Sequence, residues 1–123
     1  MIFLAEQLHQ TGADLRNALV LMGSEVPFPF QTVRSTVSTF GIPEHISAAM
    51  PDLESLGIAS RLASLQGYAG CYQGYVTDLA KQWLYGCNAM QLLQTEIFAC
   101  GPEPMLKAAA KIAAQFSLPC QLC

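Results

Sequence analysis

The chain has 123 residues, of which 52% are hydrophobic and 12% are charged, enough apolar material for one core and too much for a disordered chain. A formal net charge of −3, with only six Lys and Arg, excludes nucleic-acid binding through a basic surface. The longest aliphatic run, 18–22, is far shorter than the roughly 20 residues of a membrane span, and no basic segment follows Met1. We therefore expect one cytoplasmic domain over residues 1–123, with no nucleic-acid or membrane partner.

The cysteines, at positions 71, 87, 100, 120 and 123, are odd in number and favour reduced thiols over a disulfide framework. Cys120 and Cys123 form a nominal C-x-x-C, but the other three offer no second pair at metal spacing. We expect no complete metal site in this chain. A thiol-redox or metal function built on Cys120 and Cys123 is the least favoured hypothesis, because no helix follows to lower a thiol pKa.

The first segment, 1–10, carries apolar residues at i, i+3, i+4 and i+7 and predicts a helix that Gly12 ends. No capping Ser, Thr, Asp or Asn precedes this helix, which suggests that an upstream segment is missing. The next run, 18–22, is continuously apolar and predicts a strand buried on both faces, ending in the turn Gly23-Ser24-Glu25.

The middle of the chain is harder to assign. The segment 31–40 has apolar residues at i and i+4, but its Thr and Ser content makes a helix a weak prediction. The segment 45–56 has a better helical repeat, with Pro51 straining its middle and Gly57 ending it. The alternation over 58–65 predicts a strand.

A glycine-rich loop, 67–74, is the one local candidate for a phosphate cradle. It lacks both G-x-G-x-x-G and the Lys-Ser/Thr pair of a Walker loop, so a flexible connection is the favoured interpretation. Thr77 is expected to cap the next helix, with Trp83 packed inward. The segment 88–94 predicts a short helix.

The most informative stretch is an apolar run, 97–100, cut by Gly101-Pro102 and followed by a helix over 103–116. Prolines and Glu103 suit a helix start, where N–H groups are unpaired and the dipole is positive. Cys100 would be the last strand residue, facing a space where free N–H groups can bind a ligand. The alternative is an ordinary strand-turn-helix junction with a buried thiol.

With a last short strand at 119–123, helices and strands alternate along the chain. This order predicts an α/β fold with a parallel, doubly wound sheet, whose ligands bind beyond the carboxyl ends of the strands.

The segment 99–105 contains C-G-P-x-x-M and closely resembles the signature of the nucleotide-binding half of ferredoxin-NADP reductase-like flavoproteins. Two further segments, 74–79 and 119–121, resemble one branch of that family, the electron-transfer subunit of dihydroorotate dehydrogenase. The resemblance spans essentially the whole chain. It implies that the first strand of the family's sheet, which lies between 18–22 and 97–100, is absent. We then expect two open strand edges, with instability or self-association through them.

The resemblance implies an oxidoreductase part that passes electrons between FAD and NAD or NADP, with the nicotinamide lying against the flavin. Cys100 would contact the nicotinamide and is the catalytic candidate. Glu25 favours NAD, because a carboxylate repels a 2′-phosphate, although it could equally be a solvated turn residue. The implied cofactor-binding positions are Gly23, Ser24 and Glu25 at the adenosine end, Gly74, Tyr75 and Thr77 beside the nicotinamide, and Gly101, Pro102 and Glu103 at the corner.

The resemblance also implies partners. An FAD-binding domain and the ligands of a [2Fe-2S] centre would lie outside this chain, so the chain alone is not expected to turn over. An FMN-containing dihydroorotate dehydrogenase catalytic subunit would supply electrons from dihydroorotate. The alternative function is a non-catalytic, truncated interaction module that binds nucleotide weakly or docks to a partner.

Overall fold

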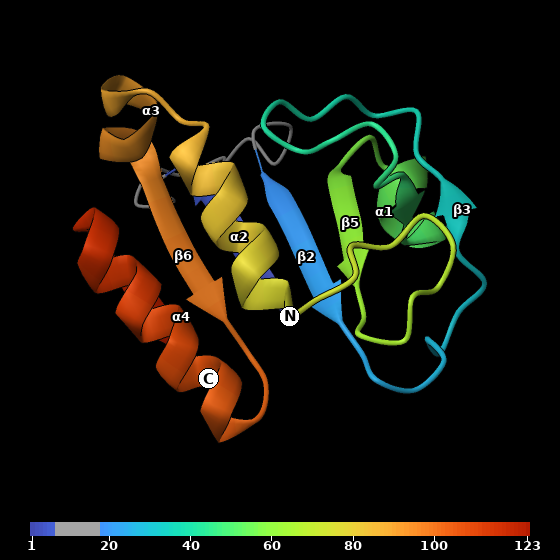
Figure 1. The fold of residues 1–123 in the computed structure, drawn as a ribbon. Helices are drawn as coiled ribbons and strands as arrows, with labels where there is room; N and C mark the ends of the chain where they lie inside the picture. Colours follow the sequence, from blue (N-terminus) through green and yellow to red (C-terminus); the bar gives the residue numbers. More distant parts are fainter. Residues whose placement is uncertain (7–17) are drawn as a thin grey trace.

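The computed structural model describes residues 1–6 and 18–123 (Figure 1). They contain a five-stranded sheet. The strand order is β5-β2-β1-β6-β7. Two pairs, β2 with β5 and β6 with β7, are parallel, whereas β1 is antiparallel to both of its neighbours. The carboxyl ends of β2, β5, β6 and β7 therefore share one edge, called here the carboxyl rim. The strands are β1 (Ile2–Glu6), β2 (Leu19–Gly23), β5 (Ala59–Ala63), β6 (Thr95–Ala99) and β7 (Cys120–Leu122).

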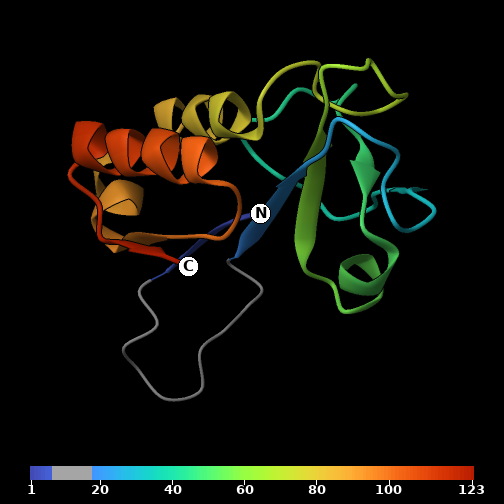
Figure 2. The ribbon, with the colours of Figure 1, turned by 90° about the horizontal axis from the view of Figure 1, so that it is seen from below.

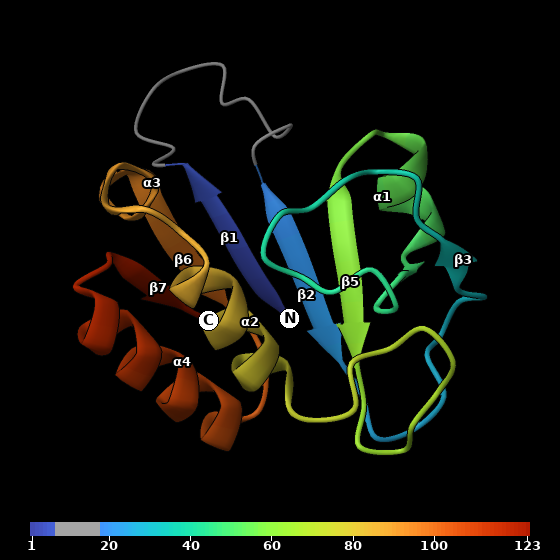
Figure 3. The same cartoon turned by 45° about the horizontal axis from the view of Figure 1, so that its top comes forward.

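The predicted helix over 1–10 is wrong where the structure describes it, because Ile2–Glu6 form the central strand. Figure 3 shows β1 running opposite to β2 and β5. Ile2 and Leu4, at alternate positions, are 1% and 0% exposed. Burial between two strands, with ladder hydrogen bonds on both sides, outweighs the helical repeat. The remainder of the predicted helix, 7–10, lies outside the described residues.

The sheet is mixed, so the prediction of a fully parallel, doubly wound sheet is only partly correct. What holds is an α/β fold with parallel strand pairs and helices. The prediction of two open strand edges, one on β2 and one on β6, is also wrong, because β1 pairs with both strands. The physical reason is the same: a strand edge buried in a core needs a hydrogen-bonding partner, and the nearest apolar segment supplies it.

Helices α2 (Val76–Tyr85) and α4 (Glu103–Phe116) cover one face of the sheet, as Figure 2 shows. The helix predicted over 103–116 is confirmed, and Trp83 packs inward at 8% exposure. Thr77 is not the cap of α2. The helix begins one residue earlier, Tyr75 occupies the N-cap position without a side-chain hydrogen bond, and Thr77 is itself buried.

The first core cluster lies between the sheet and helices α2 and α4. The second core cluster forms around β2 and β5, where α1 (Pro51–Ser55) and β4 (Ala48–Ala49) pack. The segment 31–40 is not helical and contributes only β3 (Val33–Arg34), which pairs with β4. The helix predicted over 45–56 is shorter than expected. Pro51 starts it instead of straining its middle, because a first-turn residue needs no N–H partner.

The remaining predicted elements are confirmed. The strands predicted over 18–22, 58–65 and 119–123 correspond to β2, β5 and β7. The short helix α3 (Ala89–Gln94) starts with a capping box, in which the Asn88 side chain accepts from the Gln91 N–H and the Gln91 side chain accepts from the Asn88 N–H.

Candidate functional site

The corner between β6 and α4 lies at the carboxyl rim and is open to solvent. Cys100, Gly101 and Pro102 are all exposed. Strand β6 ends at Ala99, so Cys100 follows the strand and is not its last residue. The alternative of a junction with a buried thiol is wrong, because the Cys100 side chain is exposed.

The backbone of this corner is tied to the start of β1. The Cys100 N–H donates to the Met1 carbonyl at 2.9 Å, and the Met1 amino group donates to the Cys100 carbonyl at 2.6 Å. The Met105 side chain lies against Gly101, where a Cβ atom would be 2.8 Å from Met105 Cε. A larger residue at position 101 would displace Met105, whose unbranched thioether can adapt to a ligand.

An apolar groove of about 390 Å³, called here the α2–α4 groove, lies beside the corner. It brings together two segments that are far apart in the sequence, since Tyr75 and Thr77 come from the start of α2 and Pro102 from the start of α4. Its full lining is Tyr75, Val76, Thr77, Pro102, Pro104, Met105 and Ala108. Three of the predicted site residues therefore line one cavity, of a size that suits a small ring.

Gly23, Ser24 and Glu25 lie at the carboxyl end of β2. A Cβ atom on Gly23 would be 3.0 Å from the Val76 Cβ, so this glycine lets the end of β2 approach the start of α2. The Ser24 hydroxyl donates to the Val26 carbonyl at 2.7 Å. The exposed Glu25 carboxylate accepts the Leu65 N–H, with both oxygens at 3.2 Å. Glu25 is thus tied to the loop that follows β5.

The loop 67–74 hydrogen-bonds within itself and to its neighbours. The Tyr72 N–H donates to the Leu62 carbonyl at 2.8 Å, and the Gly74 N–H donates to the Ser64 carbonyl at 3.3 Å. A Cβ on Gly74 would lie 2.6 Å from the Tyr72 ring, which explains a glycine there. The N–H groups of Tyr72 and Gly74 therefore hold the end of this loop against β5, which favours its interpretation as a connection.

Glu103, the last predicted site residue, lies outside the groove lining. Its carboxylate pairs with the Lys107 ammonium at 3.3 Å, four residues further along α4. The two side chains are 75% and 78% exposed, so this ion pair contributes little to stability.

Four of the thiols have a raised pKa. Burial raises the pKa of Cys71 and Cys120, and raises that of Cys87 to about 11. The pKa of Cys100 is raised mainly by a hydrogen bond with the Cys123 thiol. In residues 1–6 and 18–123, no group of three or more His, Cys, Asp or Glu side chains is placed to hold a metal ion.

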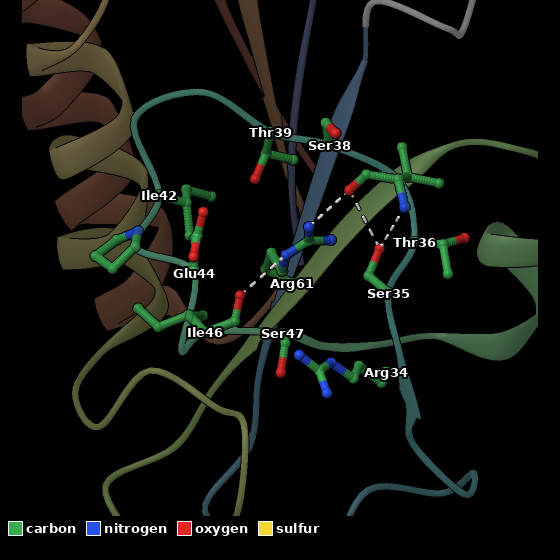
Figure 4. Close-up of a pocket in the computed structure, with 12 residues that line it drawn as sticks. Arg34, Ser35, Thr36, Ser38, Thr39, Ile42, Glu44, Ile46, Ser47 and Arg61 are labelled. Atoms are coloured by element: carbon green, nitrogen blue, oxygen red, sulfur yellow. Dashed lines mark hydrogen bonds between the residues drawn. The ribbon is translucent and has the colours of Figure 1, made fainter.

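A second cavity of about 280 Å³ was missed by sequence reasoning (Figure 4). Its floor contains Arg61, 6% exposed, in the middle of β5. The guanidinium donates to the carbonyls of Val37, Ile46 and Ser60 at 2.7, 3.1 and 2.6 Å. An arginine inside the predicted strand 58–65 was the signal, because such a side chain needs several acceptors when it is buried. Arg61 therefore has a structural role, in which its guanidinium clamps the loop 35–47 against β5.

Glu54 holds the same loop from the other side. Its carboxylate accepts the Thr36 N–H at 2.6 Å and the Ser35 hydroxyl at 2.8 Å. Partial burial acts to raise the pKa of Glu54, but these hydrogen bonds outweigh it and the pKa is lowered. Burial lowers the pKa of Arg61, and the nearby Glu54 charge opposes that shift.

Comparisons with protein families, with characterised proteins and with solved structures gave no match to this chain. Among the helices that the structure describes, none combines the length and the apolar character that crossing a membrane requires.

Proposed function

We propose that this chain is the pyridine-nucleotide-binding part of a flavin-dependent oxidoreductase that passes electrons between FAD and NAD, as in the electron-transfer subunit of dihydroorotate dehydrogenase. The observation that supports this most is the α2–α4 groove. Tyr75 and Thr77 belong to one segment that carries the family resemblance, and Pro102 belongs to another. They line one cavity at the carboxyl rim, where open α/β sheets bind ligands.

The proposed role of the groove is to hold and orient the nicotinamide ring. The walls contributed by Val76, Pro102 and Met105 are apolar, and Tyr75 is 61% exposed and free to cover a bound ring. Cys100 lies at the corner beside the groove. Hydride transfer between nicotinamide and flavin is chemistry of the cofactors, so the residues of this chain act by alignment and by excluding water.

The dinucleotide would extend from the groove along the rim toward Gly23 and Ser24. The start of the 14-residue helix α4 would lie beside this path. Pro102 and Pro104 have no N–H, so the N–H groups of Glu103 and Met105, with the partial positive charge of the helix start, would favour a pyrophosphate. Glu25, at the far end, carries a negative charge that opposes a 2′-phosphate. We therefore propose NAD over NADP.

The test is a titration of the full chain with NADH and NADPH, followed by nicotinamide fluorescence. We expect NADH to bind more tightly than NADPH. Replacing Ala108, which lines the groove, by Phe should weaken NADH binding at least about tenfold, because the ring would fill the cavity. The matched control is Ala110→Phe, an exposed position on the same helix, which should leave binding unchanged.

Unchanged binding in Ala108→Phe would contradict the proposed site. Failure of the original chain to bind either nucleotide would instead favour the alternative, a non-catalytic interaction module. One observation favours that alternative: β1 runs antiparallel, so its amino end and not its carboxyl end reaches the rim. A parallel central strand would have placed a following loop there.

A further inference from the structure

The ends of β6 and β7 bring two cysteines together. The parallel register pairs Ala99 with Leu122, and the Cys123 N–H donates to the Ala99 carbonyl at 2.9 Å, which extends the ladder by one step. Cys100 therefore lies opposite Cys123. Neighbouring strands are about 4.8 Å apart. That spacing falls within the roughly 4.4–6.8 Å between Cα atoms that a disulfide requires.

Both side chains are accessible, since Cys100 and Cys123 are exposed and lie side by side at the ends of neighbouring strands. We propose that Cys100 and Cys123 form a reversible dithiol–disulfide site at the carboxyl rim, oxidised by low-molecular-weight disulfides such as glutathione disulfide. The inference does not depend on nucleotide binding, since strand pairing alone places the two thiols.

The sequence spacing points to a different pair, Cys120 with Cys123. On a strand, residues three apart face opposite sides. Cys120 packs against the first core cluster and is half-buried, whereas Cys123 is exposed beside Cys100.

The oxidation proceeds by two thiol–disulfide exchanges. The thiolate of one cysteine attacks a sulfur of glutathione disulfide, forms a mixed disulfide and releases one glutathione thiolate. The second cysteine, as its thiolate, attacks the protein sulfur of that mixed disulfide and releases the second glutathione. Two protein thiols lose two protons and two electrons, and one glutathione disulfide is reduced to two glutathione molecules.

The test uses the folded full chain in a glutathione redox buffer, quenched with iodoacetamide and digested with trypsin. Cleavage after the lysines gives peptide 82–107, with Cys87 and Cys100, and peptide 112–123, with Cys120 and Cys123. A bond between Cys100 and Cys123 links the two peptides. A bond between Cys120 and Cys123 stays within one peptide and lowers its mass by two hydrogens.

We expect the linked peptides in the original chain and in the controls Cys87→Ser and Cys120→Ser, and their yield to fall at least about tenfold in Cys100→Ser and Cys123→Ser. Cys123 is exposed, so its replacement keeps the test valid if Cys100→Ser does not fold. Linked peptides that persist in Cys123→Ser, a dominant bond within 112–123, or the absence of any oxidised product would overturn the proposal.

Discussion

At the residue scale, the structural role of Arg61 could not be predicted from the sequence. It stands in a strand whose five residues are all buried, and three backbone carbonyls satisfy its guanidinium. The strand itself was predictable from alternation over 58–65. The acceptors were not, because Val37 and Ile46 come from a loop whose path depends on tertiary contacts.

Arg61→Met should lower the free energy of unfolding by about 1–3 kcal/mol, because three carbonyls lose their donor. Urea denaturation of the full chain measures this change. Arg34 lines the same cavity but is exposed, so Arg34→Met should change stability by less than about 0.5 kcal/mol. Equal effects of the two substitutions would contradict the clamp assigned to Arg61.

Glu54 makes stability depend on pH. Its pKa is lower in the folded protein than the ordinary value of 4.5, so the unfolded chain binds the proton more readily. The stabilisation is present above the ordinary value and is lost as the pH falls through the lowered one. Thermal unfolding measured across that acid range should therefore be less pH-dependent in Glu54→Gln, and an unchanged dependence would show that Glu54 does not carry it.

At the element scale, the sequence predicted correctly the features that depend on residues close together in the chain, such as helix caps and helix ends. The capping box at Asn88 and Gln91, the apolar face of α4 and the end of α1 before Gly57 all agree with the sequence. Gly57 has φ +74°, a left-handed conformation that glycine adopts easily. The failures, at 1–6 and 31–40, are segments whose helical repeat competed with sheet partners that no local pattern reveals.

The cap of α3 is testable by itself. Asn88→Ala removes the acceptor for the Gln91 N–H and should lower the free energy of unfolding by about 1 kcal/mol. Gln94→Ala, at the exposed end of the same helix, is the control and should have little effect. Urea denaturation compares the two, and equal losses would mean that the capping box adds nothing.

At the scale of the whole molecule, the central position of β1 decides how the sheet holds together. Leu4 is fully buried at the middle of the sheet, and its strand pairs on both sides. Leu4→Ala should therefore lower the free energy of unfolding by about 2–5 kcal/mol, which denaturant unfolding would measure. Leu56, 70% exposed, is the control, and Leu56→Ala should be nearly neutral.

The sheet's arrangement also explains how much of the candidate site was predictable. The corner at Cys100, Gly101 and Pro102 follows from local signals and lies at the rim as expected. The groove does not follow from them, because it forms only when α2 and α4 pack side by side on one sheet face. The contact between Cys100 and Cys123 likewise needed the register of β6 with β7.

The most direct test of the proposed function is to add NADH to isotope-labelled protein and follow the backbone amide signals by NMR. The account predicts that the largest shifts fall on Tyr75, Thr77, Gly101 and Met105, around the α2–α4 groove. Amides that line the Arg61 cavity, such as Ser38 and Ser47, should not move. Shifts confined to that cavity, or no shifts at all, would contradict the account.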